Sequence, residues 1–285
     1  MERTTGELLR DATRVLGPVS ATPALDAELL LGHVLGRSRA SLRAHGEQPL
    51  TAPQAARLES LLARRLAGEP VAYLVGRRGF WTLDLEVDPA VLVPRPETEL
   101  LVETALARLR SLPAPAILDL GTGSGAIALA LAAELPAAEI VAVDASPAAL
   151  AVARHNAKAL RLDRVAFLLG RWFEPVGSRR FDAIVANPPY LAADDPHLAA
   201  LDREPPDALV AGLTGLEALE AIVAGASSHL QPGGLLLLEH GCEQGAAVRA
   251  LCLGAGFDSV ETLRDLAGLE RVTRARHAAA GTPDG

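Results

Sequence analysis

The tetrapeptide Asn187-Pro188-Pro189-Tyr190 follows an apolar run, Phe181–Ala186, that is typical of a buried strand. A residue before proline is held in extended geometry, and proline has no N–H, so the carbonyl directions of Asn187 and Pro188 are fixed. The Asn187 side-chain oxygen and the Pro188 main-chain oxygen can then accept hydrogen bonds from one planar –NH₂ group. Tyr190 can place an aromatic face against the flat amide or base that carries this nitrogen.

Such a nitrogen is a poor nucleophile, because its lone pair is delocalised into the neighbouring π system. Acceptors on both N–H bonds raise its electron density and aim the lone pair, which is what transfer of a methyl group from a sulfonium requires. We therefore predict Asn187, Pro188 and Tyr190 as catalytic residues, and the whole tetrapeptide, including Pro189, as the substrate-binding turn. The alternative is a rigid turn that only ends the strand, since Asn-Pro and Pro-Pro are common breakers.

A second motif, Gly121-Thr122-Gly123-Ser124-Gly125, follows the apolar run Ala116–Leu120 and precedes a helical stretch. Its glycines permit close backbone approach to a ligand at the carboxyl end of a parallel strand. The next strand ends in Asp144, whose carboxylate can accept both hydrogen bonds of a ribose diol. Together they predict a site for an adenosine-containing cofactor formed by these five residues and Asp144.

Two alternatives stay open for this site. Gly121, Gly123 and Ala126 also satisfy the dinucleotide pattern GxGxxA, and Asp144 could instead cap the helix that starts near Pro147. Trp172 follows the third strand, where its indole could stack on an adenine or simply cover the sheet edge. We include Trp172 and Asn187 among the cofactor-binding residues and predict no metal ligands.

Strands and helices alternate around these motifs, which favours a parallel sheet covered on both faces. The last two strands, Asp258–Leu263 and Leu269–Ala275, are joined by a loop with Gly268 and should be antiparallel. The predicted strands are Ala116–Leu120, Glu139–Asp144, Val165–Leu169, Phe181–Ala186 and Leu235–Glu239; the predicted helices lie near 97–110, 125–134, 147–160, 215–230 and 242–254.

The first part of the chain has a different pattern. Three helices are expected, near 8–16, from Pro23 to Gly36 and from Thr51 to Gly68, followed by short β-like runs between Val71 and Val93. The resulting domains are a helical domain at 1–75, a β-hairpin linker at 76–93, a catalytic domain at 94–277 and a flexible tail at 278–285.

Composition excludes several classes of protein. The apolar stretches are too short to cross a bilayer, the N-terminus lacks a secretory signal, and two cysteines without metal-binding spacing favour a reducing cytoplasm. Residues 1–75 hold nine Arg and eight acidic residues, whereas the remainder holds 18 basic and 27 acidic residues. A protein that grips duplex DNA normally presents a basic face, so this acidic part argues against a DNA substrate.

The motifs together resemble the release-factor glutamine methyltransferases, the PrmC/HemK family. The resemblance covers nearly the whole chain and is most specific where Pro94-Arg95-Pro96-Glu97-Thr98-Glu99 is joined to a helical front domain. The other matching segments are DLGTGSGAIALA from Asp119 to Ala130, the turn Asn187–Tyr190, Glu204-Pro205 with Ala208-Leu209, and Asp265–Gly268 with Arg271.

This resemblance implies a class I methyltransferase with a seven-stranded, mostly parallel Rossmann-like sheet behind a helical substrate-recognition domain. It implies S-adenosyl-L-methionine as methyl donor and the glutamine of the Gly-Gly-Gln motif of release factors as the substrate. We expect a cytoplasmic monomer without DNA or membrane partners. The roles of Arg95, Glu97 and Glu99 cannot be derived from the sequence. Rival hypotheses are a DNA-adenine methyltransferase, a dehydrogenase that shares the glycine loop, and a non-catalytic module that binds release factors through residues 1–75.

Overall fold

The computed structural model describes residues 3–278, and the chain divides into two compact units, Met1–Arg77 and Arg78–Gly285. Residues 279–285 of the predicted tail lie outside the described part. In the first unit, α2 starts at Pro23 and ends before Gly36, whose φ of 62° is left-handed. The helices of this unit are α1 (Thr5–Leu16), α2 (Pro23–Leu35), α3 (Arg39–Ala44), α4 (Ala52–Leu66) and α5 (Val71–Val75).

The β-like assignment of Val71–Val75 was wrong, because this segment is the helix α5. Pro70 fixes the entry to the helix with a φ of −58°, and Gly76 ends it in the left-handed region. Ala72, Tyr73 and Leu74 are buried, so packing against the leucine-rich core of this unit overrides the strand propensity of the two valines. The short helix α3 was also not predicted.

After α5 comes a two-stranded hairpin, β1 (Arg77–Phe80) and β2 (Leu83–Glu86), which belongs to the second unit from Arg78 onward. Its main sheet has seven strands in the order β10-β11-β9-β6-β3-β4-β5. β11 pairs antiparallel with both of its neighbours, and the other pairings are parallel, as the sequence predicted. The strands are β3 (Ala116–Leu120), β4 (Glu139–Asp144), β5 (Ala166–Leu169), β6 (Phe181–Ala186), β9 (Leu230–Glu239), β10 (Asp258–Arg264) and β11 (Glu270–Arg276).

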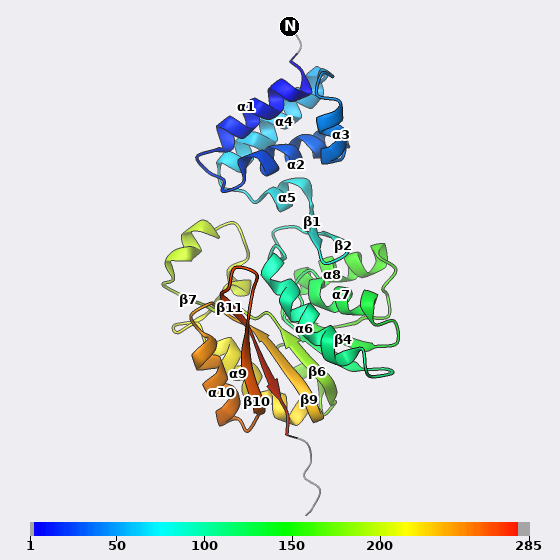
Figure 1. Cartoon of the computed structure of the whole chain (residues 1–285), viewed down its shortest axis with the longest axis vertical. Helices are drawn as coiled ribbons and strands as arrows, with labels where there is room; N and C mark the ends of the chain where they lie inside the picture. The colour runs from blue at the N-terminus through cyan, green and yellow to red at the C-terminus, as the bar shows by residue number, and fades with distance from the viewer. Residues whose placement is uncertain (1–2, 279–285) are drawn as a thin grey trace, which may run out of the picture. The chain divides into compact units, whose positions relative to one another are not determined.

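Helices cover both faces of this sheet (Figure 1). One face packs against α6 (Glu99–Leu109), α7 (Ala126–Glu134) and α8 (Pro147–Ala159), and the other against α9 (Glu217–His229) and α10 (Gly245–Gly254). None of the described helices combines the length and apolar character needed to cross a bilayer. A short pair, β7 (Leu191–Ala192) and β8 (Val210–Gly212), was not predicted.

The chain order places a topological switch point between β3 and β6. The chain runs outward from β3 through β4 to β5 and then returns to β6 on the opposite side of β3. In such sheets the loops after the two central strands diverge and leave a crevice at their carboxyl ends. Both motifs of the sequence analysis lie at this edge.

Candidate active site

The register of the sheet brings the two motifs together. Leu120 of β3 pairs with Ala186 of β6, so Gly121 and Asn187 leave neighbouring strands at the same level. Asp144 ends β4 on the other side of β3. The residues that were predicted to bind the cofactor and the substrate therefore meet at one edge of the sheet.

The glycine loop forms a backbone cradle at this edge. Gly121 and Gly123 have φ values of 75° and 55°, where a side chain would be strained, and a Cβ on Gly123 would enter open space. The loop is tied to β4, because the N–H groups of Gly121 and Thr122 donate to the Val143 carbonyl at 2.9 and 3.0 Å. Ser124 is buried, and its carbonyl accepts from the Asn156 side chain. A ligand can thus approach the backbone of the loop closely.

Asp144 is bound to this loop rather than to the end of the next helix. Its carboxylate accepts hydrogen bonds from Gly123 N at 2.8 Å and from Ser146 N at 2.9 Å. The cap of α8 is Ser146, whose hydroxyl accepts from Ala149 N, so the alternative role of Asp144 as a helix cap is wrong. Burial raises the pKa of Asp144. A carboxylate has about four acceptor positions, which leaves room for a ribose diol.

Replacing Asp144 by Ala should weaken cofactor binding roughly 10-fold or more, because a hydrogen bond to a charged group contributes about 1.5–3 kcal/mol. Calorimetric titration with S-adenosylmethionine measures the change. The matched control is Asp182→Ala, which removes a carboxylate that accepts from Ala116 N at 2.8 Å at the opposite end of the strands. Equal affinities for the two variants would exclude Asp144 from the cofactor site.

Asp119 is a candidate cofactor residue that the sequence analysis did not select. It lies two residues before Gly121 on β3 and is 0% exposed. Thr122 Oγ1 donates to its Oδ2 at 2.7 Å, whereas its Oδ1 is buried without a hydrogen-bond partner. Burial raises the pKa of Asp119 to about 7. An unpaired acceptor of this kind beside the glycine loop suits a positively charged cofactor such as S-adenosylmethionine. The sequence feature that could have identified it is an acidic residue two positions before the glycine motif.

Trp172 lies beside the glycine loop. A Cβ added to Gly121 would be 3.9 Å from its indole ring, and Arg171 lies over the ring with its Cζ 5.9 Å from the centroid. The indole nitrogen is buried without a hydrogen-bond partner, and the ring packs against one of the two cores of the sheet. This position is compatible with both expected roles, the stacking surface for an adenine and the cover of the sheet edge.

The Asn187 amide has a defined partner on one side. Its Nδ2 donates to Thr98 Oγ1 at 3.1 Å. Within residues 3–278, no protein donor bonds to Asn187 Oδ1 or to the Pro188 carbonyl, so both acceptors expected from the sequence are available to a ligand. Pro188 is buried and Pro189 half-buried.

Tyr190 is half-buried, and its backbone is anchored from the far side of the turn. The Tyr190 carbonyl accepts from Gln244 Nε2 at 3.0 Å, and the same amide group donates to the Gly215 carbonyl at 3.2 Å. Burial, reinforced by the nearby Glu239 carboxylate, raises the pKa of Tyr190 to about 12. Its phenol is therefore neutral at physiological pH, and the residue offers a ring rather than a base.

The segment from Arg95 to Glu99 gains structural roles that its sequence did not reveal. Arg95 forms an ion pair with Glu204, a carboxylate that is 5% exposed and also accepts from Val93 N at 3.0 Å. Glu99 Oε1 accepts from the N–H of Trp81 in the hairpin turn at 2.8 Å. These contacts fix the segment that carries Thr98 to the site.

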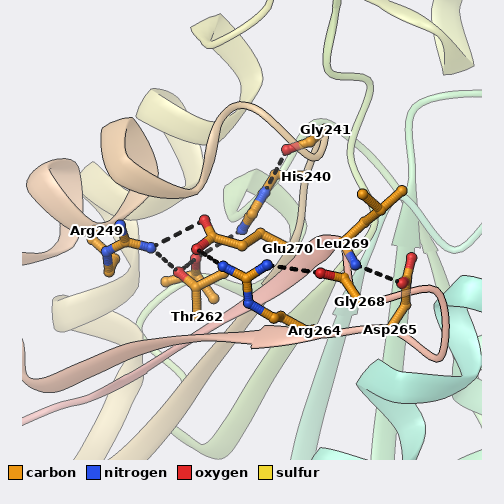
Figure 2. Close-up of polar contacts among 10 residues, drawn as sticks. His240, Gly241, Arg249, Thr262, Arg264, Asp265, Gly268, Leu269 and Glu270 are labelled. Atoms are coloured by element: carbon orange, nitrogen blue, oxygen red, sulfur yellow. Dashed lines mark hydrogen bonds and ion pairs between the residues drawn. The ribbon is translucent and has the colours of Figure 1, made fainter.

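His240 follows β9 and is held by protein partners. Figure 2 shows its Nδ1 at the Gly241 carbonyl, 2.8 Å away, and its Nε2 lies 2.8 Å from Thr273 Oγ1. Thr273 bonds in turn to Thr262, which accepts from Arg249. Burial lowers the pKa of His240. It is a neutral structural residue and not a base. Among the described residues, no group of three or more His, Cys, Asp or Glu could hold a metal ion.

Comparison with known proteins agrees with this architecture. Residues 7–76 match a family model described as the PrmC N-terminal domain, and residues 96–203 match the methyltransferase small domain. The release factor glutamine methyltransferase of Xylella fastidiosa (strain Temecula1) is 53% identical over 254 residues, covering 88% of this chain and 92% of that protein. Its counterpart in Escherichia coli (strain K12) is 49% identical over 271 residues, covering 94% and 97%.

Solved structures share the fold of the catalytic unit. A methyltransferase from Pyrococcus furiosus has a TM-score of 0.53 at 19% identity and covers 77% of this chain and 99% of its own. A T. thermophilus 16S rRNA methyltransferase, solved with AdoMet and guanosine, has a TM-score of 0.54 at 24% identity and covers 70% and 49%. These likenesses confirm the predicted class I methyltransferase fold.

Proposed function

The chain belongs to the release factor glutamine methyltransferase family, and on this premise we propose that Asn187, Pro188 and Tyr190 hold a release-factor glutamine for methyl transfer. The reaction is the S-adenosylmethionine-dependent methylation of the side-chain amide nitrogen, N5, of the glutamine in the Gly-Gly-Gln motif. The observation that carries the assignment of residues is the pair of open acceptors, Asn187 Oδ1 and the Pro188 carbonyl, beside the glycine loop.

The cofactor S-adenosylmethionine supplies a methyl group on a positively charged sulfur, which is a strong electrophile. We assign Gly121–Gly125 to the methionine part, Asp144 to the ribose and Trp172 to the adenine. Asp119 adds a buried carboxyl group near the end of β3, just before the loop; burial raises its pKa to about 7, and a bound positive charge would favour its ionised form. Asn187, at the boundary of the two sites, touches both ligands in this assignment.

The substrate amide donates its two N–H groups to Asn187 Oδ1 and the Pro188 carbonyl. This pairing raises the electron density on nitrogen and directs its lone pair toward the methyl carbon. Pro189 keeps the turn rigid, and the ring of Tyr190 lies against the amide plane. Positioning of this kind can lower the barrier by on the order of 7–11 kcal/mol. The proton leaves after attack, when the nitrogen has become acidic, so no general base is assigned.

We propose that the unit Met1–Arg77 recognises the release factor, within a division into a recognition domain at 1–75, a linker at 76–93 and a catalytic domain at 94–277. The two compact units of the chain and the match of residues 7–76 to the PrmC N-terminal domain support this proposal. The excess of acidic residues after residue 75 supports a protein substrate over duplex DNA. Action on release factors, which serve translation, supports a cytoplasmic location, and we propose that the enzyme is a monomer.

Incubation with S-adenosylmethionine and a purified release factor should add one methyl group to the motif glutamine, as read by mass spectrometry of the digested factor. A factor that lacks this glutamine is the control and should gain none. A short peptide with the motif should react much more slowly than the whole factor, because it cannot reach residues 1–75. Methylation at another residue, or equal rates for peptide and factor, would contradict the corresponding part of the proposal.

A further inference from the structure

Asn156 is a buried amide on α8 that the proposed chemistry does not use. It is 1% exposed, and its side-chain oxygen and nitrogen are paired with main-chain atoms. Its Oδ1 accepts from Glu86 N at 2.8 Å, and its Nδ2 donates to the Glu86 carbonyl at 2.9 Å and to the Ser124 carbonyl at 3.0 Å. Glu86 ends the hairpin strand β2, and Ser124 lies in the glycine loop. One side chain therefore joins the hairpin to the cofactor loop.

The residue type matches these three partners. An amide offers an acceptor and two donors, and here they meet one N–H and two carbonyls. This set of partners also defines which end of the Asn156 amide is the oxygen, because the exchanged form would place N–H against N–H. A carboxylate of the same shape could accept from Glu86 N but would turn an oxygen toward both carbonyls. Asparagine is thus a side chain that satisfies all three groups at once.

The helix α8 also contacts the glycine loop through packing. A Cβ added to Gly125 would lie 3.3 Å from the Cβ of Ala153, which is buried one helical turn before Asn156. The helix therefore fixes the loop at two adjacent positions, Ser124 and Gly125. Ser124 is 3% exposed, and a buried carbonyl without a partner is unfavourable. Loss of the Asn156 hydrogen bond should therefore favour another conformation of the loop.

The hairpin is built into the catalytic unit at other points as well. Phe80 and Leu85 are 1% and 0% exposed in the core that α6 and α7 form with the sheet. The Trp81 indole donates to Glu134 Oε1, at the end of α7, at 2.9 Å. The same helix begins at the glycine loop, since Gly125 is its N-cap residue. The hairpin thus contacts both α7 and α8, the two helices that hold the loop.

We propose that Asn156 is a positioning residue that holds the glycine loop in its cofactor-binding form and couples the loop to the hairpin. Binding of S-adenosylmethionine restricts the loop and, through Asn156, the hairpin. The coupling is reciprocal, so an ordered hairpin strengthens cofactor binding by the factor by which bound cofactor favours the ordered hairpin. The hairpin is then part of the support of the cofactor site. This inference rests on the proposed function, which places the cofactor at this loop.

The affinity for the cofactor tests the positioning role. Asn156→Ala removes the three hydrogen bonds and keeps a residue that favours a helix. Its Kd for S-adenosylmethionine should rise about 10-fold, because main-chain groups are then buried without partners. Asn156→Asp keeps the acceptor and loses both donors, so its Kd should rise at least as much. Calorimetric titration of the full chain measures both values, and a wild-type Kd in either variant overturns the positioning role.

Two comparisons separate this role from general stability and from the site assignment. Val248→Ala removes packing from a residue that is 0% exposed in the core on the other face of the sheet. It should lower the melting temperature and keep the wild-type Kd. An equal loss of affinity in Val248→Ala would mean that any loss of stability weakens binding, which overturns the specific role of Asn156. A weakened Kd in Asp144→Ala confirms the site itself, so that a wild-type Kd in Asn156→Ala then counts against the positioning role alone.

Hydrogen exchange tests the coupling and needs no substitution, so it decides this point even if the variants do not fold. In the wild type, peptides that cover the hairpin at 77–86 should exchange several-fold more slowly at saturating S-adenosylmethionine. In Asn156→Ala, the same saturation should leave hairpin exchange at its cofactor-free rate. Peptides from α10 are the control segment and should change little. Wild-type hairpin exchange that does not respond to the cofactor, equal slowing in α10, or full protection in Asn156→Ala would overturn the coupling.

Discussion

Asn187→Ala should lower kcat for methyl transfer on the order of 10³-fold, comparable to the loss of a preorganised polar contact in other enzymes. The variant removes the Oδ1 acceptor and keeps the Pro188 carbonyl, so the substrate amide loses one of its two partners. A delocalised nitrogen with one free N–H is less electron-rich, and it can rotate away from the methyl carbon. Single-turnover assays with radiolabelled methyl donor measure the effect.

The cofactor affinity of the same variant separates a catalytic role from a collapse of the pocket. Asn187 is half-buried, and its described side-chain contact is the hydrogen bond to Thr98, so the glycine loop and Asp144 should keep their geometry. Calorimetric titration should then give a Kd for S-adenosylmethionine within a few-fold of the wild type. Near-normal turnover in Asn187→Ala would contradict the acceptor role.

The two motifs were predictable because each carries its geometry in adjacent residues. Glycines with positive φ and prolines without N–H restrict the backbone whatever surrounds them, and the strands before them are apolar runs. Parallel strands meet at their carboxyl ends, so the meeting of Gly121 and Asn187 also followed from the predicted alternation.

The partners of these motifs were not predictable, because they come from distant segments. Asn187 bonds to a threonine 89 residues away, and Glu204 reaches Val93 across 111 residues. A sequence pattern contains no register for such contacts. The helix α5 was missed for a related reason, since its valines favour a strand and only burial against other helices decides the outcome.

Asp119→Asn should stabilise the protein without cofactor and weaken cofactor binding, two effects of opposite sign from one carboxyl group. Asn keeps an oxygen that can accept from Thr122 Oγ1, so the local hydrogen bond is retained. What it loses is the charge. Truncating one partner of a buried charge pair costs about 2–5 kcal/mol, so the affinity for the positively charged cofactor should fall on the order of 10²-fold.

The stability effect follows from the raised pKa. Burial raises the pKa of Asp119 from 3.8 to about 7 in the folded protein. For a group whose folded pKa lies above its unfolded value, the contribution to stability is present below the unfolded pKa and is lost as pH rises through the folded pKa. Asp119 should therefore destabilise the wild type most above pH 7, where its side chain is charged. One pKa unit corresponds to about 1.4 kcal/mol, so the effect is on the order of a few kcal/mol.

Thermal unfolding of both proteins across about pH 5 to 8 can resolve this linkage. The higher melting temperature of Asp119→Asn should be most evident at the alkaline end and should shrink as the pH falls toward 5, where the wild-type carboxyl is protonated in the folded state. Glu239, whose pKa burial also raises to about 7, is present in both proteins, so its contribution cancels in the difference. A variant that melts lower than the wild type at pH 8 would show that the Asp119 charge is not a cost to the folded chain. A variant that binds S-adenosylmethionine with wild-type affinity would show that this charge is not a partner for the cofactor.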